Sequence, residues 1–186
     1  YDRTAGLEYN LASANNFWTG KIAYHQNMNA KFDSGTFMHA ANIEYDRRDI
    51  GFGWQHEIVG ENYNPEVGFV PRRDYIRINP DFRYRFFPNN MPNLVSHGPF
   101  ISSEAFFSRD GNFLESESFL DYNFEFLDRS EFSVWTSHNY LELRNPFDPT
   151  NTGSDTLAAG TDYSWHAGGF NYESKPSSLF TYELAT

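Results

Sequence analysis

Apolar and polar side chains alternate at successive positions along much of this chain, and no other feature constrains its fold as strongly. Successive side chains of an extended strand point to opposite faces, so this period predicts strands with one apolar and one polar face. No comparable stretch has the period of a helix. We therefore predict an all-β chain, with the clearest strands in 37–46, 50–58, 76–86 and 120–126.

The connections between the predicted strands are of two kinds, short and long, which alternate along the chain. Short polar turns are expected at 13–15, 47–49, 89–93, 128–130 and 174–178. Longer linkers are expected at 27–36, 60–72 and 144–160, with 109–112 as a short exception. Short turns at one edge and long loops at the other are typical of an antiparallel, up-and-down transmembrane β-barrel in the bacterial outer membrane. We expect about ten strands in one domain, 1–186.

A soluble β-sandwich or a lipocalin-like barrel would also alternate. The predicted strands run to about 10–13 residues, however, where soluble strands usually have about 5–6. Aromatic residues are abundant (19 Phe, 12 Tyr and 4 Trp) and cluster near the strand ends, as in the girdles of membrane barrels. These features favour a barrel whose apolar face contacts outer-membrane lipid.

Composition excludes several other classes. The net charge of −11 disfavours a nucleic-acid partner, which would need a basic surface. The chain has no cysteine, so it can form neither disulfides nor thiolate metal sites. Its longest stretch without Asp, Glu, Lys or Arg, 86–103, contains three prolines and cannot be a membrane helix.

The polar faces of the strands carry charges of both signs. A basic side chain facing lipid at mid-membrane costs roughly 2–4 kcal/mol, so we expect Ile76, Ile78, Phe82, Tyr84 and Phe86 to face lipid. The interior should then be lined by Glu44, Glu57, Arg77, Arg83, Arg85, Glu104, Asp121 and Glu125. Enclosed arginines need partners. We expect the three arginines to pair with Glu57 and Glu104, or with Glu44 one strand further away.

The segment 60–74 has the sequence GENYNPEVGFVPRRD. Its core resembles the signature of the family known as domain of unknown function 5916, found in Bacteroidota and some other Gram-negative bacteria. The resemblance covers most of the chain and is most specific at this motif: Asn64, Pro65, Glu66, Gly68, Phe69, Pro71, Arg72, Arg73 and Asp74. It implies an outer-membrane barrel preceded by a carbohydrate-binding family 9-like domain. It also implies glycan binding or uptake at the cell surface, with glycans and other outer-membrane proteins as partners.

The motif also has a physical interpretation. Residues before proline avoid the helical region, so the loop should be extended. We expect it to fold inward, pinned by Arg72, Arg73 and Asp74; a plain solvated loop is the alternative. The carbohydrate-binding domain is not in this chain, which ends in a strand-like run. We therefore expect a partial barrel whose first strand, 3–11, does not pair with its last, 179–185.

Sequence patterns give little support for catalysis in this segment. There is no G-x-S-x-G elbow, and the six histidines show no close spacing, so a metal site would need distant residues to converge. Glu115 with Glu117, and Asp121 with Glu125, could meet the spacing of glycosidase carboxylates, although a solvated face explains them better. The 148–155 loop does not fit the calcium-loop pattern. We predict no catalytic residue, metal or cofactor here. The alternatives are a glycan-active hydrolase with catalytic groups in loops or in the missing domain, and a soluble β-sandwich binding module.

Overall fold

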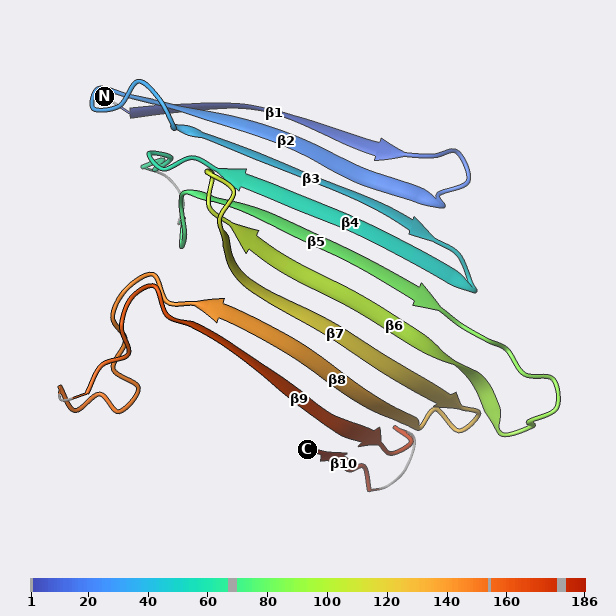
Figure 1. The fold of residues 1–186 in the computed structure, drawn as a ribbon. Coiled ribbons are helices and arrows are strands. Elements are labelled where there is room, and N and C mark those ends of the chain that lie inside the picture. The colour runs from blue at the N-terminus through green and yellow to red at the C-terminus, as the bar shows by residue number, and fades with distance from the viewer. Residues whose placement is uncertain (1, 67–69, 154, 177–179) are drawn as a thin grey trace.

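The computed structural model describes residues 2–66, 70–153, 155–176 and 180–186. They form one ten-stranded antiparallel sheet in which the strands lie side by side in chain order (Figure 1). The strands are β1 (Asp2–Ala12), β2 (Trp18–Asn29), β3 (Phe37–Asp46), β4 (Ile50–Val59), β5 (Tyr75–Tyr84), β6 (Leu94–Phe107), β7 (Phe113–Phe126), β8 (Glu131–Glu142), β9 (Asp162–Glu173) and β10 (Glu183–Ala185). The prediction of an all-β, up-and-down fold of about ten strands is confirmed.

The sheet is open. β1 pairs only with β2, and β10 pairs only with the end of β9. The prediction that the first and last strands do not pair with each other is therefore confirmed in the described residues. A β-sandwich would need a second sheet, and the described residues form a single one.

The connections lie as the sequence predicts. The loops 30–36, 60–74, 108–112 and 143–161 lie at one edge of the sheet, which we call the loop edge. The connections 13–17, 47–49, 85–93, 127–130 and 174–182 lie at the other, which we call the turn edge.

Phe86 was expected within the fifth strand. It lies beyond β5 and forms only an isolated bridge with His97, because the chain turns there toward Pro88.

Directly paired residues share a face of the sheet, so the pairing defines two faces. The apolar face carries exposed hydrophobic side chains, including Leu7, which is 80% exposed, and Tyr9, which is 64% exposed. The polar face is more enclosed, since Val59 and Ser137 on it are almost fully buried. Ile76 and Phe82 lie on the apolar face, opposite Ile58 and Phe52. Arg77 and Arg83 alternate with them and lie on the polar face, as predicted.

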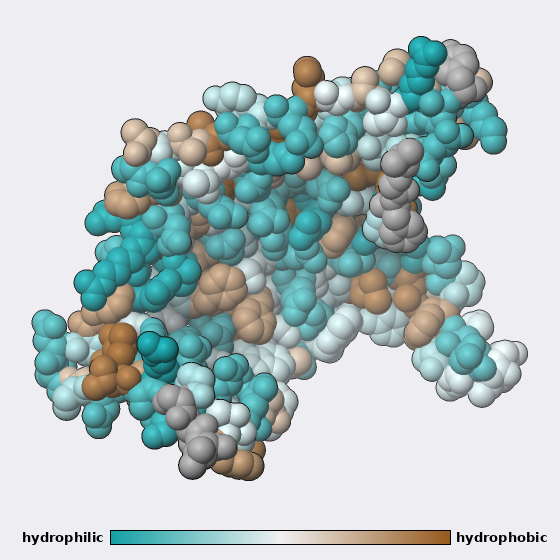
Figure 2. Space-filling model, turned by 180° about the vertical axis from the view of Figure 1, so that it is seen from behind, coloured by the Kyte–Doolittle hydropathy of each residue, from teal (hydrophilic) through white to brown (hydrophobic). Residues whose placement is uncertain are grey.

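The hydrophobic core is small. Val59, Tyr63 and Tyr75 are its buried residues, and it lies at the loop edge of the polar face. Met38, Val70 and Phe106 pack against them. The view from behind shows mainly hydrophilic residues, with hydrophobic side chains in separate small groups (Figure 2). In the described part of the chain, no helix is long and apolar enough to cross a membrane.

Candidate functional site

The loop 60–74 packs against the polar face of the sheet at its loop edge. Gly60 donates its N–H to Phe37, and Asn62 donates to the carbonyl of Gly35. A β-carbon on Gly60 would lie 2.1 Å from that same carbonyl oxygen, so the two loops approach closely only because position 60 is glycine. Tyr63 is then buried in the core, and burial raises the pKa of its hydroxyl. The loop therefore begins in a fixed position.

Three charged residues hold the other end of the loop. Nη1 of Arg72 lies 2.9 Å from Oε2 of Glu115, and its guanidinium lies over the ring of Phe106 at 4.5 Å. Arg73 donates to the side-chain oxygen of Asn64 across the loop at 2.7 Å. Arg144, in the 143–161 loop, lies 3.8 Å from a carboxylate oxygen of Asp74. These contacts agree with the expected pinning.

The remaining motif residues are placed as follows. Asp74 has a φ of 61°, a left-handed conformation in which the chain turns sharply into β5. Asn64 and Pro65 lie in irregular backbone, and Glu66 lies at a bend and is exposed. Gly68 and Phe69 lie outside the described residues. Pro71 directly precedes Arg72 in irregular backbone.

Two of the three polar-face arginines form ion pairs. Arg77 lies 2.5 Å from Glu104 on the neighbouring strand β6, the partner that the sequence predicts. Arg83 pairs with Asp46 at 2.5 Å, an acid that was not among the expected partners Glu57, Glu104 and Glu44. The reason is the register: Arg83 lies opposite Gly51, which lies opposite Asp46, so the long side chain passes over a glycine. Expecting Glu57 or Glu44 for Arg83 was wrong.

Arg85 does not follow the prediction. Among the described residues, no carboxylate lies within ion-pair distance of it. It lies one residue past β5, where its backbone N–H bonds to Asp49 and its side chain no longer faces a paired strand. It lines a hollow of the polar face with Arg83 and Glu125. The expectation of a carboxylate partner for Arg85 was wrong.

The other predicted charges lie on the polar face without basic partners in the described chain. Glu44 is opposite Gly53, and Asp121 is opposite Phe100 and Trp135. Glu125 accepts a hydrogen bond from the hydroxyl of Ser96 at 3.0 Å. Glu57 lies opposite Arg77, although the ion pair of that arginine is to Glu104. The sequence thus assigns these acids to one face correctly, but not their contacts.

An aromatic group on the polar face escaped the sequence analysis. Phe119 lies between Phe100 and Trp135, with ring centroids 6.5 and 6.0 Å apart. Polar neighbours such as Asp121 and Ser133 flank these rings. The only signal in the sequence was their position on the polar side of the alternation, where an aromatic residue is unexpected.

Two histidine pairs form across strands on the other face. Nε2 of His56 lies 3.3 Å from Nδ1 of His39, and Trp54 donates its indole N–H to His56. The rings of His138 and His166 are 4.6 Å apart. In the described residues, no group of three or more His, Cys, Asp or Glu side chains could hold a metal ion.

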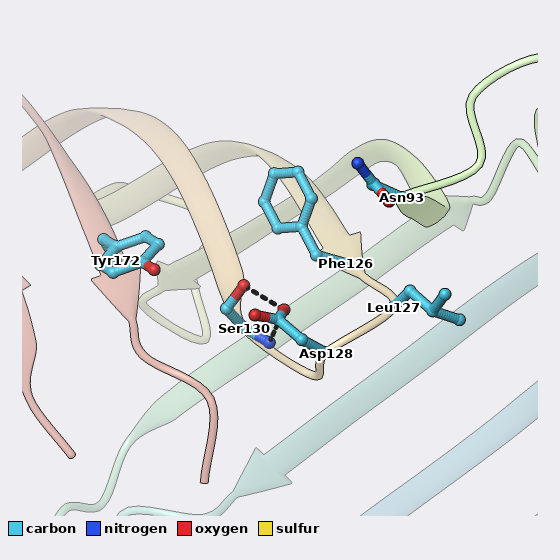
Figure 3. Close-up of a pocket in the computed structure, with 6 residues that line it drawn as sticks. All are labelled: Asn93, Phe126, Leu127, Asp128, Ser130 and Tyr172. Atoms are coloured by element: carbon cyan, nitrogen blue, oxygen red, sulfur yellow. Dashed lines mark hydrogen bonds between the residues drawn. The ribbon is translucent and has the colours of Figure 1, made fainter. Parts of the chain in front are cut away.

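A hollow lies at the turn edge, away from the predicted residues. Its volume is about 650 Å³. Figure 3 shows Phe126 and Tyr172 on opposite sides of it, with the Asp128–Ser130 turn below. The carboxylate of Asp128 accepts hydrogen bonds from Ser130 within the turn, and these bonds lower the pKa of Asp128. Two smaller clefts, of about 380 and 220 Å³, lie mainly over the polar face.

No protein-family model, curated protein or solved structure matches this chain. The geometry of the chain itself must therefore support a function.

Proposed function

We propose that this chain forms part of the wall of a transmembrane β-barrel in the outer membrane of a Gram-negative bacterium. Its apolar face contacts lipid, and its polar face lines the interior. The barrel serves glycan binding or uptake at the cell surface and does no chemistry in this segment. The loops extend to the outside of the cell and the short turns to the periplasm.

The observation that carries the proposal is the path of the hydrophobic residues across the apolar face. On β1 the exposed hydrophobic residues centre on Tyr9. Residues that pair directly from one strand to the next form a row across the sheet. The row that begins at Tyr9 passes through Ile22 and Ile78 and ends at Ser164 on β9. By β7 to β9 this row is largely polar. On the apolar face of those strands, the exposed hydrophobic residues are Phe113 at the start of β7, and Leu120, Val134 and Phe170 nearer the turn edge.

The band of exposed hydrophobic residues is thus oblique to the rows. Phe170 lies six residues beyond Ser164 along β9, or about 20 Å at 3.4 Å per residue. Eight strand spacings of about 4.8 Å separate β1 from β9, or about 38 Å. The band therefore makes an angle of roughly 30° with the rows, close to the 35–45° strand tilt of membrane barrels. A flat membrane produces this geometry, because a level band must cross tilted strands obliquely.

Two further points support the glycan part of the proposal. The segment 60–74 resembles the domain of unknown function 5916 family, for which glycan handling is implied. The aromatic rings of Phe119 and Trp135, placed among polar groups, are the type of surface on which sugar rings stack. Both points concern the polar face and the loop edge, not the lipid face.

The membrane part is tested by lipid quenching of a fluorophore at single cysteines, which the cysteine-free chain allows. In liposome-reconstituted full-length protein, a label at Tyr9→Cys or Phe170→Cys should be strongly quenched by brominated acyl chains. Ser164→Cys is the matched control: it lies in the same row and face as Tyr9, but outside the oblique band. Equal quenching at Ser164 and Tyr9, or none at Phe170, would contradict the proposal.

A further inference from the structure

A cleft on the polar face of β6 to β9 combines an exposed indole with carboxylates. Glu104, Glu117, Asn139 and Trp165 lie directly opposite one another on four successive strands. They form one row, with neighbouring β-carbons about 5 Å apart. The cleft has a volume of about 220 Å³.

The charges in the cleft are not balanced by the chain. Glu104 and Glu117 are directly opposite, an arrangement that destabilises a strand pair. Arg77 compensates Glu104, and Arg72 compensates Glu115 in the next row. No Lys or Arg lies within ion-pair distance of Glu117 in the described residues, and β6 to β10 contain neither residue type.

The far wall of the cleft is aromatic. Trp165 is 47% exposed, although the polar face is otherwise the more enclosed one. Asn139 lies between Trp165 and Glu117 and lines the cleft. Its side-chain nitrogen donates to Ser137 at 2.9 Å, and its side-chain oxygen remains available as an acceptor. An indole face attracts cations, and a carboxylate with no basic neighbour strengthens that attraction. An anionic solute would be repelled by the same groups.

We propose that this cleft binds a small organic cation, a protonated amine or a quaternary ammonium ion. The carboxylate of Glu117 neutralises it, the indole of Trp165 covers its apolar groups, and the side-chain oxygen of Asn139 accepts a hydrogen bond where the cation carries N–H. The inference rests on the proposed function in one respect: it names a class of solute that the polar face of the barrel would hold.

The test uses the full-length protein in a non-ionic detergent and isothermal titration calorimetry with three probes. These are choline, its neutral carbon isostere 3,3-dimethyl-1-butanol, and maltose. We expect choline to bind at least tenfold more tightly than the isostere, because the two differ only in charge. Glu117→Gln and Trp165→Leu should each weaken choline binding about five- to tenfold. Glu131→Gln, an acid on the same face but outside the cleft, should leave it unchanged.

Equal affinity for choline and the isostere, no binding of choline at millimolar concentration, or no effect of Glu117→Gln would each overturn the inference. Binding of maltose alone would also overturn it, while supporting the glycan part of the proposed function. Lipid quenching at Phe170 tests the barrel separately, so the two failures are distinguishable.

Discussion

Arg72 connects the loop 60–74 to the sheet through two kinds of contact. Its guanidinium pairs with Glu115 and lies over the rings of Phe106 and Tyr75, at 4.5 and 5.6 Å. A planar guanidinium can donate at its edge while its face stacks on a ring, whereas an ammonium group is a point charge. The attachment of the loop therefore depends on the shape of this side chain as well as on its charge.

We expect Arg72→Lys to release the loop without unfolding the sheet. Loss of the stacking contacts should cost about 1–1.5 kcal/mol, which makes local opening about tenfold more frequent. Chymotrypsin, which cleaves after aromatic residues, should then cut at Tyr63 about tenfold faster. Arg73→Lys is the control, because Arg73 contacts only Asn64 across the loop. Equal cleavage rates in wild type and Arg72→Lys would show that these contacts do not hold the loop.

Gly98, in β6, is required by a close approach of the backbone. A β-carbon there would lie 1.9 Å from the carbonyl oxygen of Tyr84, and a backbone atom within a sheet cannot move away at low cost. We expect Gly98→Ala to destabilise the folded protein by about 2–3 kcal/mol. Gly168→Ala in β9 is the matched control, since its nearest atom would be 3.2 Å away.

Urea titration of both variants in detergent measures the difference. Gly168→Ala should lie within about 1 kcal/mol of wild type. A midpoint for Gly98→Ala equal to that of Gly168→Ala would mean that the β5–β6 contact can relax.

At the scale of strands, the sequence predicts a great deal. Alternation places β3 and β4 almost to the residue, because a half-buried strand imposes a period of two on its side chains. The predicted strand 76–86 runs two residues past the end of β5, and 120–126 covers only the second half of β7. It does not predict which side chains meet, since that depends on register. Arg83 reaches Asp46 only because Gly51 lies between them, and the row from Glu104 to Trp165 depends on the registers of three strand pairs. The aromatic residues of the polar face break the alternation and were missed for that reason.

The 143–161 loop is organised by one carboxylate. Asp148 accepts hydrogen bonds from the hydroxyl of Thr150 and from the backbone N–H groups of Thr150, Asn151 and Gly153. The Thr150 hydroxyl is the largest cause of a lowered pKa at Asp148, followed by the Gly153 N–H. The calcium considered for this loop would have to compete with these donors.

A lowered folded-state pKa fixes the sign of the pH effect on this loop. The stabilisation is fully present above the unfolded pKa of about 4 and is lost as pH falls through the lower folded value. We expect the protection factors of the Asn151 and Gly153 amides to fall below about pH 4. Asp148→Asn should lower them at neutral pH and remove the pH dependence. Protection that is independent of pH in the wild type would contradict this account.

The molecule as a whole exposes an apolar face and two unpaired strand edges. Each unpaired backbone group in lipid costs several kcal/mol, and in water an exposed edge pairs with other chains. We expect residues 1–186 alone to precipitate without detergent and to form oligomers in detergent, whereas the full-length barrel stays monodisperse. Analytical ultracentrifugation of both proteins is the measurement. A monomeric, detergent-free preparation of 1–186 would contradict the membrane proposal.

The ladder between β5 and β6 is interrupted near its middle. The pairing passes from Ile78 directly to Asp81, since Pro80 has no N–H to donate. The side chain of Asn79 donates to the carbonyl of Ser103 instead, at 3.2 Å. All Lys and Arg residues of the strands lie on the β1–β5 side of this gap, and Arg77 reaches across it to Glu104.

Mechanically, the sheet therefore consists of two parts, β1 to β5 and β6 to β10, joined along this interrupted ladder. Apart from β10, which pairs with only three residues of β9, we expect the sheet to part at the β5–β6 ladder under tension or heating before any other strand pair opens. The Arg77–Glu104 ion pair and the Asn79–Ser103 hydrogen bond would then be the contacts that hold β5 to β6 across the interruption. In the proposed barrel, an increase in circumference would begin at this strand pair.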